Sequence, residues 1–168
     1  MEVAVFIKND FEYPVKISSV KFNVKKVKSR VAYRIHLYKN SENNSYPKEE
    51  LLIDNKIEYL EVNSKGLVSV DLSEYNITLP KEGVFISIEG IGGKNTSSTK
   101  NKKNLIQFET HLSELEIYQE RNYKNNIGWI NINKWLPENY LKTFNKIYDK
   151  RKLFVPSFGL TVQKIEID

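Results

Sequence analysis

Apolar and polar residues alternate along much of the chain, which is the pattern of strands with one buried face. Tyr33, Ile35 and Leu37 share one face of such a strand, whereas Arg34 and His36 lie on the other. Similar alternation occurs in the segments 20–24, 68–72, 84–88 and 160–162, and shorter β-like runs occur at 57–62, 105–108, 115–118 and 127–132. The pattern therefore predicts many short strands.

The alternation changes phase at two places. At Ser18–Ser19 and near Gln163–Lys164, apolar residues move from odd to even positions or the reverse. One extra residue in a strand restores the inward face after such a slip, so we predict a β-bulge at each place.

The order of the predicted elements indicates an all-β fold. Many short strands with frequent turn signals, and no regular alternation of strand and helix, predict an antiparallel two-sheet β-sandwich of jelly-roll-like form. We expect residues 1–168 to form this single domain, because the chain length suits one domain. One short helix is predicted near the C-terminus, where Pro137 suits a first helical position and Tyr140, Leu141 and Phe144 follow at helical spacing.

The middle of the chain carries a series of structural motifs. The Arg-containing strand Tyr33–Tyr38 leads into a Tyr-led loop and through Pro47 to the paired leucines Leu51–Leu52. The next strand ends in Asp71-Leu72-Ser73, whose side chains suit hydrogen bonds to backbone amides. Pro80 and Gly83 then bracket a turn that is expected to need a positive φ.

In these motifs, over about residues 18–89, the chain resembles the carboxypeptidase-regulatory-like proteins of the Bacteroidetes, in a β-sandwich region outside their regulatory-like domain. The resemblance implies a jelly-roll-like domain of a cell-envelope protein, located outside the cytoplasm in the periplasm or at the cell surface. It brings no catalytic residues with it.

Composition narrows the class of protein further. The chain of 168 residues has 40% apolar residues and no cysteine, so it is expected to fold without disulfides, a thiol nucleophile or Cys-ligated metal. No apolar run approaches the roughly 20 residues of a spanning helix, and we expect no membrane insertion. The residues after Met1 look like a strand, so no signal peptide is expected in this chain.

Residues that carry chemistry are few. The two histidines, His36 and His111, lack the spacing of a metal pair, and phosphate-binding and nucleophile motifs are absent from the sequence. Carboxylate pairs are the remaining route to catalysis, because glycoside cleavage needs only two acids. Glu89 with Glu109 is one such pair, and Glu114 with Glu116 is the other. We expect no catalytic residues, no metal and no cofactor.

Binding is the favoured functional prediction. Trp129, Trp135 and Tyr123 lie close together in the sequence with Asn126 and Asn131. An exposed aromatic ring offers an apolar platform to a sugar face, and asparagine supplies paired donors and acceptors. We therefore predict a ligand-binding site at these five residues, with a polysaccharide or an envelope protein as partner. The alternative is that the tryptophans fill the core.

The sequence as a whole predicts a non-catalytic accessory binding or interaction domain of a cell-envelope protein, with carbohydrate as the candidate ligand. The first alternative is a carbohydrate-active hydrolase or lyase on a β-sandwich scaffold. A weaker alternative is a nucleic-acid-binding domain that uses the basic run Lys25–Arg30. We favour a solvated hairpin turn for this run and expect no nucleic-acid partner, because it lies between two alternating segments.

Overall fold

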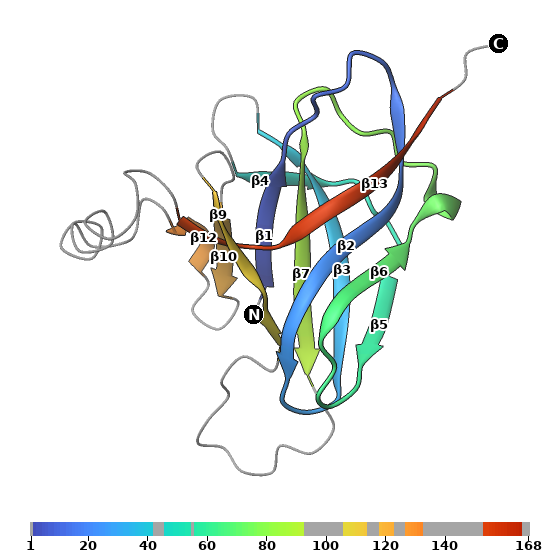
Figure 1. The fold of residues 1–168 in the computed structure, drawn as a ribbon. Helices are drawn as coiled ribbons and strands as arrows, with labels where there is room; N and C mark the ends of the chain where they lie inside the picture. The colour runs from blue at the N-terminus through green and yellow to red at the C-terminus, as the bar shows by residue number, and fades with distance from the viewer. Residues whose placement is uncertain are drawn as a thin grey trace.

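The strands form two main antiparallel sheets in a computed structural model that describes residues 2–41, 46–54, 56–92, 106–113, 118–122, 127–132 and 153–165 (Figure 1). The first sheet contains, in spatial order, β11 (Ile127–Asn131), β10 (Tyr118–Asn122), β1 (Glu2–Ile7), β7 (Val84–Gly92), β3 (Val31–Asn40) and β4 (Pro47–Glu50), with β5 (Lys56–Leu60) also paired to β3. The second contains β13 (Phe158–Lys164), β2 (Val15–Val27) and β6 (Gly66–Asp71), with β8 (Ile106–Phe108) also paired to β2. A two-stranded sheet pairs β9 (Thr110–Ser113) with β12 (Leu153–Pro156).

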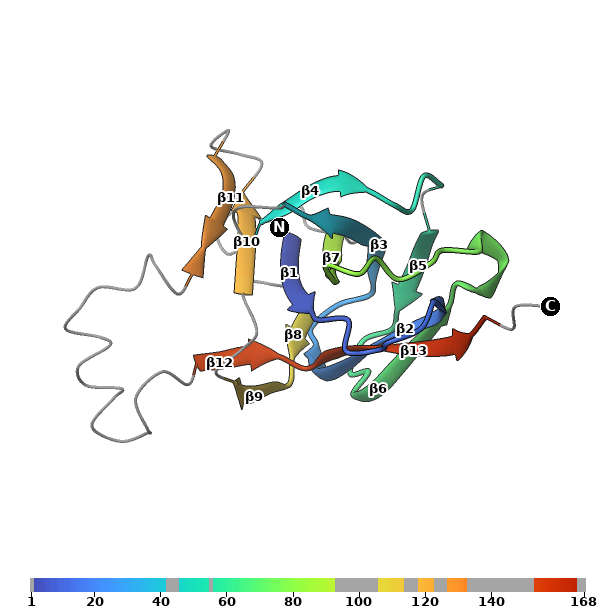
Figure 2. The same cartoon turned by 90° about the horizontal axis from the view of Figure 1, so that it is seen from above.

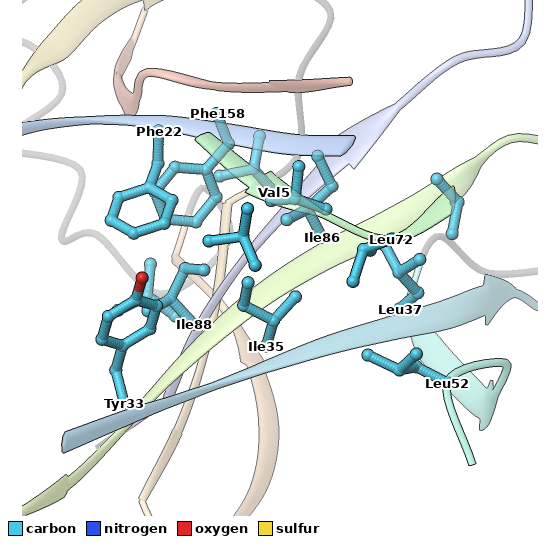
Figure 3. Packing of buried hydrophobic residues seen from close by; sticks show 14 of the residues in the cluster. Val5, Phe22, Tyr33, Ile35, Leu37, Leu52, Leu72, Ile86, Ile88 and Phe158 are labelled. Atoms are coloured by element: carbon cyan, nitrogen blue, oxygen red, sulfur yellow. The ribbon is translucent and has the colours of Figure 1, made fainter. Parts of the chain in front are cut away.

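The core lies between the two main sheets and is built from the alternating positions of their strands. Tyr33, Ile35 and Leu37 of β3 are all buried and pack opposite Phe22 of β2 and its neighbours (Figure 3). Each fully buried apolar side chain of this size contributes about 1.5–3 kcal/mol relative to its exposed state. The predicted all-β two-sheet sandwich is therefore confirmed, and so is the inward face of β3.

One of the two predicted β-bulges is confirmed. The register between β13 and β2 pairs Thr161 with Ser19 but Val162 with Ile17, so Ser18 is the extra residue on β2. This extra residue lets Ile17 and Val20 both face the core. The bulge predicted near Gln163–Lys164 is wrong, because the pairing with β2 continues in regular register through both residues.

The basic run Lys25–Arg30 begins in the last residues of β2 and is exposed except for the buried Val27 and the half-buried Ser29, but it is not a hairpin. Lys25, Lys26 and Lys28 are exposed, and the chain turns there from β2 to β3. These two strands belong to different sheets, so they do not pair with each other as a hairpin would. Arg30, at the end of the run, forms an ion pair with Glu61, whose Oε1 lies 2.9 Å from its Nε.

The turn motifs in the middle of the chain form as predicted. The Asp71 carboxylate accepts hydrogen bonds from the backbone N–H of Ser73 at 2.9 Å and from its hydroxyl at 2.6 Å. These bonds lead into the short 3₁₀ helix η1 (Ser73–Tyr75). The N–H of Gly83 donates to the Pro80 carbonyl at 3.0 Å, and Gly83 has the expected positive φ of 81°. The helix predicted after Pro137 lies outside the described residues.

The first sheet curves away from the second. In Figure 2 the second sheet lies below β1 and β7, whereas the edge strands β4 and β11 lie above them. We call the side of the first sheet that points away from the second sheet its outer face. Because of the curvature, side chains of the outer face approach one another across strands that are not adjacent.

Candidate functional site

Polar side chains, of which Glu2, His36 and Ser87 are buried, gather on the outer face of the first sheet. They occupy the strand positions that alternate with the core residues, so the same periodicity that builds the core projects them to the other side. We define the acid–histidine cluster by these residues: Glu2 on β1, Arg34, His36 and Tyr38 on β3, Glu50 on β4, and Ser87 and Glu89 on β7. The strand register brings the cluster together from four strands.

His36 lies at the centre of the cluster, between two carboxylates. Its Nδ1 is 2.6 Å from Oε1 of Glu50, and its Nε2 is 3.1 Å from Oε2 of Glu89. The imidazole is only 4% exposed and stacks on the Tyr38 ring, with 5.5 Å between ring centroids. A neutral imidazole carries one N–H, and an ionised carboxylate only accepts hydrogen bonds. Both contacts are therefore satisfied when the ring carries a proton on each nitrogen.

The pKa values of His36 and Glu89 are shifted in the directions that this arrangement requires. Burial alone lowers the pKa of His36, but hydrogen bonds to Glu89 and Glu50 and the nearby charge of Glu2 outweigh it, so the pKa is raised. The hydrogen bond from His36 lowers the pKa of Glu89, with a smaller contribution from Arg34. The imidazolium and the Glu89 carboxylate thus stabilise each other's charged forms.

Glu2 and Ser87 form the most deeply buried part of the cluster, each with 0% exposure. The Glu2 carboxylate is the acceptor at this point. Its Oε1 accepts a hydrogen bond from the Tyr38 hydroxyl at 3.0 Å and another from the Ser87 hydroxyl at 2.7 Å. Burying a carboxylate is costly unless it is hydrogen-bonded or paired, and these two donors offset part of that cost. Groups with shifted pKa values, such as His36 and Glu89 of this cluster, concentrate at functional sites, which makes the outer face the candidate site of this protein.

Arg34 stands at the side of the cluster next to β5. Its Nη1 is 3.6 Å from Oε2 of Glu89, a longer ion-pair distance than that of the His36 contact. Its Nε is buried and has no hydrogen-bond partner within the part of the chain that the structure describes. Arg34 therefore adds positive charge next to Glu89 without a close hydrogen bond.

Trp129 of β11 reaches the cluster across the curved sheet. Its ring meets the Tyr38 ring edge to face, at 5.6 Å between centroids and an interplanar angle of 75°, although β11 and β3 are not neighbours. The half-buried indole packs on a second, smaller apolar cluster formed by Ala4, Tyr38 and Phe85. Trp129 thus covers part of the outer face and keeps part of its surface exposed.

Replacing Tyr38 by Phe is expected to lower the free energy of unfolding by about 1–3 kcal/mol, because the buried Glu2 carboxylate loses the hydroxyl donor of Tyr38. Equilibrium denaturation of Y38F measures the loss. Tyr59→Phe is the matched control, because Tyr59 is an exposed tyrosine on β5, and it should stay within about 0.5 kcal/mol of the parent. Equal effects of the two variants would contradict a hydrogen-bonding role for Tyr38 in the cluster.

The structure brings two of the five predicted ligand-binding residues together. Trp129 and Asn131 lie two positions apart on β11, so they share a face of that strand, and both are half-buried. Tyr123, Asn126 and Trp135 lie outside the residues whose side chains are described. The full five-residue site therefore stays a prediction.

The sequence reasoning missed the acid–histidine cluster. It correctly placed His36 beside Arg34 on the face opposite the core, but it treated that face as solvated. The signal it passed over is the row of potential hydrogen-bonding side chains at alternate positions of β3, which includes Tyr38. The partners Glu2 and Ser87 are distant in sequence, and only the strand register identifies them.

The carboxylate pairs that the sequence suggested do not form a catalytic pair among the described residues. Glu89 points to the outer face of the first sheet, whereas Glu109 is exposed next to β8 and binds the backbone of β2 through its N–H. The interpretation that these two carboxylates face each other is therefore wrong. Glu114 and Glu116 lie outside the described residues. His111 is exposed, and its Nδ1 lies 3.2 Å from the Ser157 hydroxyl.

The described part of the chain contains no group of three or more His, Asp or Glu side chains arranged to hold a metal ion. In the same residues, no helix has the length and apolar character needed to cross a membrane. No protein-family model, curated protein or solved structure matches the chain.

Proposed function

We propose that this chain is a non-catalytic binding domain of a cell-envelope protein and that it binds polysaccharide on the outer face of the first sheet. The observation that carries the proposal is the half-buried Trp129, held edge to face against Tyr38 on the curved sheet with Asn131 beside it on β11. The envelope location follows from the family resemblance of residues 18–89.

The chemistry of these groups suits a sugar ligand. An indole ring that is fixed by packing presents its exposed surface to the C–H face of a pyranose without losing much conformational freedom on binding. Asn131 supplies a donor and an acceptor for neighbouring hydroxyls. One stacked ring and a few amide hydrogen bonds predict weak affinity, because they must offset the entropy of association.

The geometry of the carboxylates favours binding over glycoside cleavage. A glycosidase holds the scissile bond between its two acids. Here the imidazole of His36 fills the space between Glu50 and Glu89 and forms hydrogen bonds with both. A buried, doubly hydrogen-bonded imidazolium is also a poor general base, because it already carries the proton that a base must accept.

The test is a glycan array of bacterial envelope polysaccharides, followed by titration of the best ligand while indole fluorescence is recorded. The Trp135→Phe variant serves as the parent, so that Trp129 is the sole tryptophan. We expect a saturable change in fluorescence. Asn131→Ala should weaken binding about fivefold or more, which corresponds to the loss of one hydrogen bond.

Tyr13→Ala is the matched control for this experiment, because Tyr13 is an exposed aromatic residue in the segment between β1 and β2. It should leave the affinity unchanged. Weaker binding by the Tyr13 variant with unchanged binding by the Asn131 variant would place the ligand elsewhere and contradict the proposal. Release of new reducing ends during the titration would support the hydrolase alternative instead.

A further inference from the structure

The edge strand β4 is held to the first sheet by few backbone contacts. It pairs with β3 at Tyr38–Glu50 and Asn40–Pro47, with a register shift between the two pairs. Pro47 has no N–H to donate. The N–H of Leu51, directly after the strand, donates to the Leu37 carbonyl at 2.7 Å. The N–H of Ser41 donates to the Tyr46 carbonyl at 3.3 Å, and Pro47 and Leu52 are buried at the two ends of the segment. Between these anchors, the exposed residues of β4 depend on side-chain contacts to the rest of the sheet.

His36 makes one such contact. The 2.6 Å hydrogen bond from its Nδ1 to Glu50 ties β4 to β3, and the 3.1 Å bond from its Nε2 to Glu89 ties the same ring to β7. Lys39 and Glu49 form a second link between β3 and β4, at 2.9 Å, but both side chains are exposed. The contribution of such an exposed ion pair is small. Among the side-chain contacts of the described residues, the buried imidazole is therefore the main polar link across these three strands.

We propose that the second ring proton of His36 acts as a latch. While the ring carries this proton, its bond to Glu50 holds β4 against β3. Loss of the proton releases Glu50 into water and loosens β4. This inference concerns the fold of the site. Only its consequence for ligand affinity rests on the proposed function: the loosened edge should bind polysaccharide more weakly.

The charges around the ring decide which bond breaks. His36 is faced by Glu2 from β1, by Arg34 and Tyr38 from β3, by Glu50 from β4, and by Ser87 and Glu89 from β7. Glu89 retains Arg34 nearby at 3.6 Å and is 19% exposed, whereas Glu50 is 36% exposed on an edge strand. The neutral ring therefore keeps its single N–H on Glu89, and Glu50 is the partner that water can replace.

The direction of the pH dependence follows from the raised pKa of His36, in which the two carboxylate hydrogen bonds outweigh the opposing effect of burial. A group whose pKa is higher in the folded than in the unfolded protein stabilises the fold fully below its unfolded pKa, about 6.5 for histidine. This stabilisation is lost as the pH rises through the folded value. The latch is therefore closed in mildly acidic solution and opens on the alkaline side of the usual histidine range.

The experiment follows the amide of Leu51, which closes the end of β4 through its 2.7 Å bond to the Leu37 carbonyl, by NMR hydrogen exchange from pH 5.5 to 8.5, corrected for intrinsic rates, while the imidazole signals report the titration of His36. We expect the protection of this amide to fall about tenfold or more as His36 loses its proton, which corresponds to the loss of a charge-assisted hydrogen bond. The amide of Ile86 on the central strand β7 should not follow this titration.

Glu50→Gln is the decisive variant. A glutamine amide both donates and accepts hydrogen bonds, so it pairs with a neutral imidazole as well as with an imidazolium. Protection of the Leu51 amide in E50Q should therefore be independent of the His36 titration. The same pH profile in E50Q and in the parent, or unchanged protection of this amide while His36 titrates in the parent, would overturn the latch.

These measurements need no ligand, so they are separate from the test of the proposed function. If β4 loosens with pH but no polysaccharide binds, the latch stands and the proposed function fails. If polysaccharide binds while the Leu51 amide stays protected at every pH, the proposed function stands and the latch fails.

Discussion

Replacing Phe22 by Ala is expected to lower the free energy of unfolding by about 3–5 kcal/mol. Phe22 is fully buried on β2 and meets three aromatic rings edge to face. The ring centroids of Tyr33, Phe108 and Phe158 lie 5.4, 6.0 and 6.2 Å away. Truncation removes the buried ring and leaves a cavity that strands from both sheets border, so the surrounding side chains can fill it only in part.

Urea denaturation of F22A measures this loss, and Leu67→Ala provides the comparison. Leu67 lies on β6 next to β2, but it is 63% exposed, so its truncation should change the free energy of unfolding by less than about 0.5 kcal/mol. A loss below about 1.5 kcal/mol for F22A would mean that the two sheets close over the cavity and that the aromatic packing does not hold them apart.

The sequence predicted the sandwich well because side-chain direction in a strand depends on local periodicity alone. The inward position of Ile35 and the outward position of His36 follow from counting along one strand, without knowledge of its neighbours. The extra residue Ser18 was also visible, since it lies inside a long strand with buried residues on both sides. Near Gln163 the same reasoning failed because β13 leaves the core there, and exposed side chains carry no phase information.

The alternation of apolar and polar residues does not predict whether the outer face of the sheet is buried. Alternation showed that His36 lies opposite the core, and the expectation was that this side is solvated. The curvature of the sheet decides otherwise, since it brings Trp129 over Tyr38 from a strand that is not adjacent. Truncation of His36, which a solvated position would tolerate, instead leaves Glu50 and Glu89 without their shared donor.

The partners of the buried Glu2 carboxylate could not be predicted from the sequence either. Glu2 and Ser87 are 85 positions apart in the sequence, and Glu2 and Tyr38 are 36 apart. Their contact depends on which strands become neighbours, and a single strand pattern does not specify that choice. The carbohydrate ligand and the envelope location stay predictions for a related reason: they come from residue types and a resemblance, and neither fixes a geometry.

The acid–histidine cluster and the smaller apolar cluster of Ala4, Tyr38 and Phe85 lie next to each other on the outer face. Tyr38 belongs to both, because its hydroxyl donates to Glu2 and its ring contacts His36 on one side and Trp129 on the other. A change in the position of β4 or of Phe85 is therefore expected to reach Trp129 through the Tyr38 ring. This connection makes the packing of the smaller apolar cluster relevant to stability and to the test of the proposed polysaccharide binding.

Gly83 directly precedes β7 and lies next to Phe6, which packs against the smaller apolar cluster. Gly83→Ala is expected to lower the free energy of unfolding by about 2–6 kcal/mol. Its φ of 81° is unfavourable for any residue with a Cβ, at about 1–3 kcal/mol. An added Cβ would also lie 2.5 Å from the Ile7 carbonyl oxygen and 2.8 Å from Cζ of Phe6. The backbone oxygen cannot move without disturbing the pairing of β1 with β7, and overpacking of this kind costs about 1–3 kcal/mol more.

Gly66→Ala separates the two causes. Gly66 has a φ of 94°, but a Cβ there would meet no atom within 4 Å, so this variant should show the backbone strain alone. Denaturation of both variants gives the free energies, and the fluorescence of Trp129 in the Trp135→Phe background reports the outer face. We expect G83A to be the less stable of the two variants. We also expect it to shift the emission of Trp129, because Phe6 and Trp129 pack against the same apolar cluster. A displaced Phe6 would disturb the contact between the Phe6 and Phe85 rings, whose centroids lie 5.2 Å apart. Equal losses of stability, with unchanged emission in both variants, would contradict this prediction. They would show that β1 shifts to accommodate the added methyl group and that the packing of the outer face does not depend on a glycine at position 83.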